Sequence, residues 1–209
     1  MINESKPQKV DFKKELKQLY GSPKKNVLVE VPEMNYLMID GKGDPNSSAD
    51  FQTAIEALYS VSYTIKFLSK KSGIDYVVMP LEALWYMDNM ADFLKGTKDD
   101  WQWTAMIMQP NHITQEMIEG AIETVTKKKG LAGLDKLRFE AYNEGMSAQI
   151  LYVGPFDDEH PTIVKLHEFA ESNGYQVDGK HHEIYLSDFR KVDPSKLKTI
   201  IRQPVMKKN

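Results

Sequence analysis

Apolar residues follow two periods along this chain, and each period predicts a different kind of element. From Phe51 to Leu68 they return every three or four residues, which is the spacing of one face of a long helix that ends near Gly73. Apolar runs predict strands at residues 27–31, 36–39, 76–87 and 101–109. Prolines interrupt or close these runs.

The second half of the chain shows the same order of patterns. A helix at residues 114–129, with lysines at its end where positive charge suits the helix dipole, is interpreted as a connector. Strands are then predicted at 137–142, 148–153, 183–186 and 199–202, with a shorter helix around 163–170. Gly73 precedes Glu82 by nine residues, and Gly174 precedes Glu183 by nine, which supports a duplication.

These patterns predict an α+β fold built from tandem duplicated strand-helix-strand-strand modules. We expect residues 1–25 to form an N-terminal arm with a short helix at 11–20. Residues 26–205 are expected to form a single domain with pseudo-repeats at 26–110 and 137–205, joined by the connector helix. Each module would make its own antiparallel sheet with a helix on one face. The two uncovered faces would then meet around a central ligand cleft.

Strand alternation assigns side chains to the two faces of each sheet. Ile184 and Leu186 suit the helix-covered face. Glu183 and Tyr185 are therefore expected to point toward the cleft. The nine-residue alignment transfers this assignment to the first module, with the cleft face at Glu82, Leu84 and Tyr86 and the helix face at Leu81, Ala83 and Trp85.

Glutamates in a cleft walled by aromatic rings would have a clear chemical use. Aromatic planes stack on flat ligands, and a buried carboxylate neutralises a ligand cation or, with its pKa raised by burial, moves protons. Further aromatic candidates are Trp101, Trp103, Tyr142, Tyr152 and Phe156. The alternative is structural: the glutamates would face solvent or pair with Lys or Arg, and the tryptophans would pack in the core.

Signals for other chemistries are weaker. His181 and Glu183 share a strand face and could bind a metal with a third ligand, but the helical His and Glu spacings of common metal sites do not occur. The turn at residues 41–43 lacks the pattern of a dinucleotide loop, and the sequence holds neither a Gly-Lys-Ser/Thr loop nor a serine-nucleophile elbow. We therefore expect neither a metal nor a cofactor.

Composition narrows the possible classes. The 209 residues include no cysteine, which removes disulfides, thiolate metal sites and a cysteine nucleophile. A net charge of -3 and a pI near 6.0 provide no basic field for nucleic acid. No stretch has the apolar length of a signal peptide or a membrane span, so a cytoplasmic location is expected.

Several sequence strings resemble the GyrI-like small-molecule-binding proteins. They are NYLMIDGKGDP at 35–45, MPLEALW at 79–85, WTAMIMQP at 103–110, GPFDDE at 154–159 and HHEIYLSD at 181–188. The resemblance extends from about Asp11 to Val205. It implies two modules around a cleft for flat, amphipathic, often cationic compounds, with Glu183 in the place of the glutamate that meets the ligand.

The resemblance also implies an activity. Some stand-alone members of the family hydrolyse cyclopropane-bearing cytotoxins that alkylate DNA, and this chain, without a separate helix-turn-helix domain, resembles that branch. Two positions depart from the pattern, because Tyr152 and Phe189 stand where many relatives carry His and Pro. If that His orients substrate or relays protons, activity in this chain would differ.

The first functional hypothesis is therefore a detoxifying hydrolase for a cyclopropane-bearing genotoxin. Glu183 would act as general base on water, while Tyr142 or Tyr152 would donate to the ligand carbonyl. The expected ligand-binding residues are Glu82, Trp85, Tyr86, Trp101, Trp103, Phe156 and Tyr185. Two alternatives stay open: a protein that sequesters such ligands without chemistry, and a transcription co-regulator that reads a ligand. The expected partners are flat amphipathic aromatic molecules, with no nucleic acid and no membrane, and the expected state is a monomer or weak dimer.

Overall fold

The computed structural model describes residues 9–90, 93 and 97–208. Its helices are α1 Phe12–Glu15, α2 Lys17–Tyr20, α3 Ala49–Lys71, α4 Gln115–Lys129 and α5 His160–Ser172. Its strands are β1 Val27–Val31, β2 Met34–Lys42, β3 Glu82–Tyr86, β4 Gln102–Gln109, β5 Arg138–Tyr142, β6 Gly145–Val153, β7 Tyr175–Val177, β8 His181–Tyr185 and β9 Lys198–Lys207. None of the helices in the described ranges is both long and apolar enough to cross a membrane.

The two longest helices form where the apolar period predicts them, and side chains cap their first turns. The hydroxyl of Ser48 accepts a hydrogen bond from the backbone N–H of Phe51 at the start of α3. Thr114 accepts one from Met117 in the same way at the start of α4. Helix α4 ends at Gly130, whose φ of 56° lies in the left-handed region that glycine adopts without steric cost.

The predicted pair of sheets is wrong, because the strands described form one antiparallel sheet of nine strands. Its order is β1-β6-β9-β8-β3-β4-β2-β5, with β7 paired to β9. Strands β3 and β8, which the prediction places in separate sheets, pair directly, with Ala83 opposite Glu183. Joining these two edges satisfies backbone groups that two separate sheets would leave unpaired.

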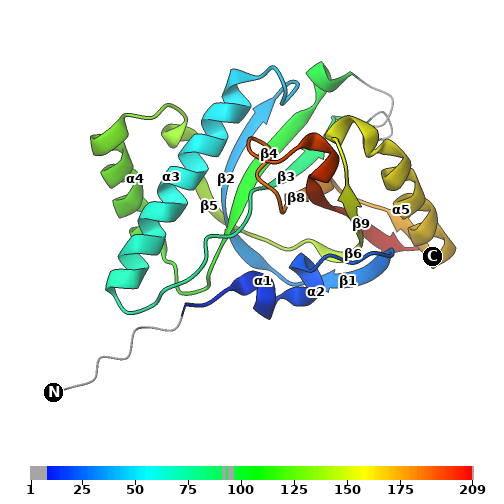
Figure 1. The fold of residues 1–209 in the computed structure, drawn as a ribbon, viewed down its shortest axis with the longest axis horizontal. Coiled ribbons are helices and arrows are strands. Elements are labelled where there is room, and N and C mark those ends of the chain that lie inside the picture. Colours follow the sequence, from blue (N-terminus) through cyan, green and yellow to red (C-terminus); the bar gives the residue numbers. More distant parts are fainter. Residues whose placement is uncertain (1–8, 91–92, 94–96, 209) are drawn as a thin grey trace.

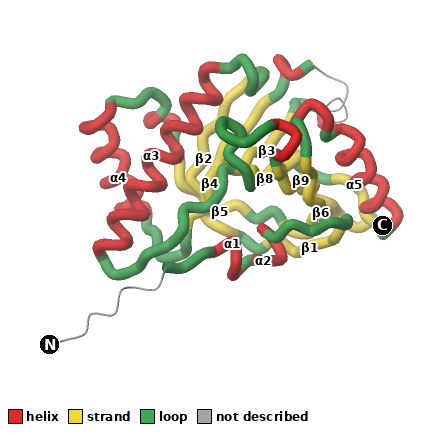
Figure 2. Tube along the Cα trace, in the orientation of Figure 1, coloured by secondary structure: helices red, strands yellow, loops and turns green. Residues whose placement is uncertain are grey.

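Helices α3 and α5 both lie on the same face of this sheet, α3 over β2 and β4 and α5 over β6 and β9, on either side of the central strands β3 and β8 (Figure 1). The ring of Phe51 on α3 packs against Trp85 and Trp103, at centroid distances of 5.4 and 5.0 Å. On α5, Ile163 packs in a cluster with Ala148 and Ile201. The space between the two helices replaces the expected cleft between uncovered sheet faces. Figure 2 shows the same separation, with the strands lying between α3 and α5.

Several element boundaries also differ from the predictions. The strand expected at 76–87 is regular only over β3, and β7 was not predicted. Strand β9 continues through Pro204 to Lys207, beyond the predicted end at residue 202. In the described part of the N-terminal arm, Leu19 and Tyr20 are buried. Tyr20 contacts Glu82 and the carbonyl of Leu19 meets Arg202, so this segment lies on the sheet face opposite α3 and α5.

A network of buried polar groups fixes this arm to the sheet. Arg202 is fully buried and donates to a carboxylate oxygen of Glu144 at 3.0 Å, to Gln149 at 2.9 Å and to the carbonyl of Leu19 at 2.7 Å. Because Arg and carboxylate side chains are costly to bury unless paired, these contacts hold the arm in one position.

His182 lies at the centre of the same network. Its Nδ1 lies 2.9 Å from Glu144, and its Nε2 lies 3.1 Å from Glu82, which also accepts a hydrogen bond from the hydroxyl of Tyr20. Burial alone would lower the pKa of His182, but the two carboxylates outweigh burial and raise it to about 8. Strand β8 therefore places His182 in a buried charge cluster on one face of the sheet. The neighbouring residues His181 and Glu183 point to the other face.

Gly41 provides a test of how tightly the first module packs. It lies opposite Trp103 in the β2–β4 ladder, and a Cβ at this position would overlap the indole ring. Gly41→Ala is expected to lower the free energy of unfolding by about 1–3 kcal/mol through overpacking, measured by urea denaturation. Gly120→Ala is the control, because a Cβ on this exposed position of α4 meets nothing within 4 Å and should be neutral or stabilising. Equal effects of the two changes would contradict the packing explanation.

Candidate functional site

A cavity of about 370 Å³ opens between α3 and α5 above the central strands. Its apolar walls are the rings of Phe51, Trp85, Phe93, Trp101, Phe156 and Phe189. Phe93 stacks on Trp101 at 4.9 Å, and Trp101 contacts Trp85 at 5.6 Å. Aromatic walls with polar groups at fixed positions are typical of sites for flat amphipathic ligands.

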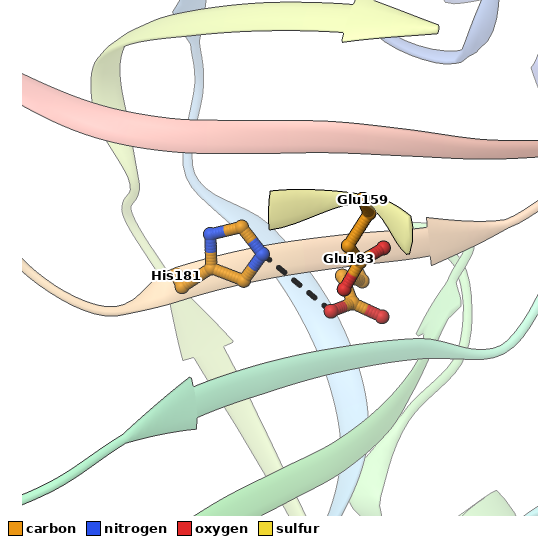
Figure 3. A group of neighbouring side chains, drawn as sticks. All are labelled: Glu159, His181 and Glu183. Atoms are coloured by element: carbon orange, nitrogen blue, oxygen red, sulfur yellow. Dashed lines mark ion pairs between the residues drawn. The ribbon is translucent and has the colours of Figure 1, made fainter. Parts of the chain in front are cut away.

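Three polar side chains gather on the floor of this cavity. His181 and Glu183 project from the same face of β8, and Glu159 reaches them from the start of α5 (Figure 3). The Nε2 atom of His181 lies 3.5 Å from Oε1 of Glu183, and one ligand-type atom from each of the three residues lies within 4.8 Å of the others. All three side chains are buried. Within the described ranges, this is the group whose spacing could hold a metal ion.

The two carboxyl groups differ in their proton affinity. Burial, followed by the negative charge of Glu183, raises the pKa of Glu159 far above its usual range. Burial acts in the same direction on Glu183, but neighbouring His181, Glu159 and Tyr185 outweigh it and hold the pKa of Glu183 below its usual range. The pair therefore shares one proton, with the negative charge on Glu183.

Five of the predicted site residues line the cavity: Trp85, Trp101, Phe156, Glu183 and Tyr185. Tyr185 accepts a hydrogen bond from the indole N–H of Trp85 at 3.2 Å, and its ring meets Phe156 edge-on at 5.6 Å. Trp85 was expected against the helix. It does contact α3, but the cavity lies on this same face, so Trp85 forms part of its wall.

Three predicted site residues lie on the opposite face of the sheet. Glu82 is fully buried in the network around His182, and Tyr142 packs edge-on against Tyr36. Tyr86 lies beneath the ammonium group of Lys180, at 3.6 Å from the ring centroid. The assignment failed because the nine-residue alignment equates Glu82 with Glu183, whereas the ladder pairs Glu183 with Ala83. An offset of one residue moves every side chain of a strand to the other face.

Two more predicted residues are near the cavity but do not line it. Trp103 is 1% exposed and lies under Phe51, against Gly41. Tyr152 donates its hydroxyl hydrogen bond to the carbonyl of Pro155 at 2.8 Å. Neither tyrosine that was expected to donate to a ligand carbonyl therefore faces the cavity.

Sequence reasoning missed the role of Glu159. It lies in the string at 154–159, but as the residue before α5 it is easily interpreted as a helix cap, since acidic groups favour helix N-termini. Phe93 and Lys98 were also missed. Lys98 is paired with Asp157 at 2.6 Å, and this contact connects two segments that line the cavity. No local pattern in the sequence indicates that these three residues come to the cavity.

The fold and the site together define a small-molecule-binding domain, with an aromatic cavity over the centre of one antiparallel sheet. Residues 27–206 match the model of the GyrI-like small molecule binding domain, and the chain belongs to this family.

Solved structures support this assignment. An uncharacterized conserved protein from Listeria innocua is 40% identical, with a TM-score of 0.87, covering 95% of this chain and 100% of its own. A hydrolase from Listeria innocua is 41% identical, with a TM-score of 0.83 and the same coverage. The C-terminal domain of EcmrR shares the fold at 15% identity, with a TM-score of 0.57, covering 88% of this chain and 98% of that domain. Among curated proteins no match is found.

Proposed function

We propose that this protein is a hydrolase that opens a strained cyclopropane ring conjugated to a flat aromatic ligand. The observation that carries the proposal is a carboxylate, Glu183, on the floor of an aromatic cavity of a GyrI-like domain. Proteins that are 40% and 41% identical over nearly the whole chain include hydrolases. Ring strain keeps the demand on the protein small, so one positioned carboxylate and a fixed ligand orientation suffice.

The reaction follows from the placement of the groups. The ligand stacks between the aromatic walls, and Glu183 accepts a proton from a water molecule as the water oxygen forms a bond to the ring methylene. The strained carbon–carbon bond breaks, and its electron pair moves through the conjugated system to the ligand carbonyl. The resulting oxyanion then takes up a proton from solvent, and Glu183 releases its proton to solvent, which restores the carboxylate. Water is thereby added across the broken bond without a cofactor.

Trp101 is the group that we assign to the developing oxyanion, in place of the two tyrosines. Trp101 lines the cavity, and its buried indole N–H has no acceptor among the described residues. A buried donor without a partner is costly, and a ligand oxygen would satisfy it. A donor aimed at developing charge stabilises the transition state more than the bound ligand.

Incubation of the purified protein with a cyclopropane-bearing DNA alkylator tests the activity directly. Mass spectrometry should show conversion to a product heavier by one water, at a rate above that of buffer alone. Recovery of unchanged ligand from a tightly bound complex would instead establish a sequestering protein.

Trp101→Phe separates stacking from hydrogen bonding at this position. The variant keeps an aromatic ring beside Phe93 and Trp85 but loses the N–H donor. We expect kcat to fall by about a hundred-fold with little change in KM, because the lost contact is made in the transition state. A rise in KM at constant kcat would show that Trp101 acts only as a wall.

A further inference from the structure

The floor of the cavity leaves buried polar atoms without partners. His181 is 1% exposed, and neither of its ring nitrogens has a hydrogen-bond partner in the described structure. Oε2 of Glu159, which is 8% exposed, is also unpartnered. Buried groups of this kind are rare and indicate a missing partner. The Nε2 atom of His181 and the carboxylate of Glu159 point toward one another and toward Glu183 (Figure 3).

The distances suit coordination better than hydrogen bonding. The 3.5 Å between Nε2 of His181 and Oε1 of Glu183 is too long for a strong hydrogen bond. It is close to the separation of about 3.3–3.5 Å that two ligands have on one tetrahedral ion with bonds of about 2.0–2.2 Å. The other separations between ligand atoms of the three residues are at most 4.8 Å, and small side-chain rotations would shorten them to this value.

Charge also favours a divalent ion at this point. A divalent cation bound to both buried carboxylates would displace the proton that they share, and its charge would then balance their two negative charges. The neighbouring charged and polar groups do not already do so. Lys98 is bound to Asp157 at 2.6 Å, Tyr185 accepts from Trp85, and His160 is exposed at the start of α5.

We propose that Glu159, His181 and Glu183 form a binding site for a zinc-class divalent ion, with the fourth coordination position open to the cavity. The mixed nitrogen and oxygen ligands and their number are those of zinc sites with one exchangeable position. Magnesium and calcium are disfavoured, because both prefer six or more oxygen ligands.

Occupation of this site would restrain the proposed hydrolysis. A carboxylate of Glu183 that coordinates zinc is no longer free to accept a proton from water. Binding of the ion rests on these three residues alone, whereas its effect on turnover rests on the proposed function. A protein without hydrolase activity would therefore still bind zinc, and the two proposals fail separately.

Zinc binding is measured by competition with the chromophoric chelator 4-(2-pyridylazo)resorcinol and by calorimetry on the full chain. We expect one ion per chain, and no displacement by a large excess of magnesium or calcium. Glu159→Gln, His181→Gln and Glu183→Gln should each weaken zinc at least about tenfold, since even groups that only support metal ligands contribute this much. His160→Gln is the matched control, because His160 lines the same cavity outside the group and should leave the affinity unchanged.

A measurement on the unaltered protein makes the test independent of how the variants fold. Cobalt in place of zinc should give the intense visible absorption of a four-coordinate ion. A weak spectrum typical of six-coordinate cobalt would overturn the proposal. So would unchanged zinc affinity in Glu183→Gln and His181→Gln, or an equal loss in His160→Gln.

Discussion

Glu183→Gln is expected to slow cyclopropane hydrolysis by about a hundred- to ten-thousand-fold, the range that a general base contributes. Glutamine preserves the size of the side chain on the cavity floor, but its amide cannot accept the proton of the attacking water. Glu183 is 5% exposed, so solvent cannot readily replace it as a base. Aromatic contacts to the ligand remain, and binding should be largely retained.

Comparison of kcat/KM between the variant and the unaltered protein, with product followed by mass spectrometry, measures this effect. Glu171→Gln is the matched control, since it removes an exposed carboxylate from α5 far from the cavity lining and should leave the rate unchanged. Equal turnover by Glu183→Gln would remove this residue from the mechanism, even if the protein proved to be a hydrolase.

Arg202→Met is expected to lower the free energy of unfolding by about 3–5 kcal/mol. Methionine replaces much of the volume of arginine but leaves buried Glu144 with His182 as its remaining cationic partner, and it also frees the carbonyl of Leu19. Burial makes the pKa of Glu144 depend on these neighbours. Desolvation alone would raise it, but His182 and Arg202 outweigh burial and hold it at about 2.

Urea denaturation monitored by circular dichroism gives the size of this effect. Lys127→Met is the control, because Lys127 pairs with Glu123 on the exposed face of α4 and such pairs contribute less than about 1 kcal/mol. The Arg202 variant should also release the N-terminal arm, which proteolysis near residues 16–20 would detect. If both variants were equally stable, the network would not hold the arm.

Local patterns predicted the elements of this fold well. The apolar period found α3 and α4, and the caps at Ser48 and Thr114 are formed by residue types that favour helix starts. Helix and strand signals reside in neighbouring residues, so no tertiary information is needed to find them. The boundaries of β3 and β9 were less accurate, because pairing partners rather than local sequence end these strands.

The candidate site was only partly predictable. Alternation along β8 placed Glu183, Tyr185 and His181 on one face, and the structure has all three on the cavity. Glu82 and Tyr86 were assigned by an alignment between modules, in which an error of one residue reverses the face. Glu159 precedes α5 and Glu183 lies on β8, so the two meet only because the chain folds back after α5. No spacing in the sequence encodes this contact.

The sequence by itself determined which segments become helices and strands, and it placed a carboxylate among aromatic residues in a chain without cysteine. Tertiary structure decided that β3 and β8 join the two halves into one sheet and that both helices cover the same face. It also separated Glu183 in the cavity from Glu82 in the charge network. Periodicity is a property of neighbouring residues, whereas strand pairing and face depend on hydrogen bonds between segments distant in the chain.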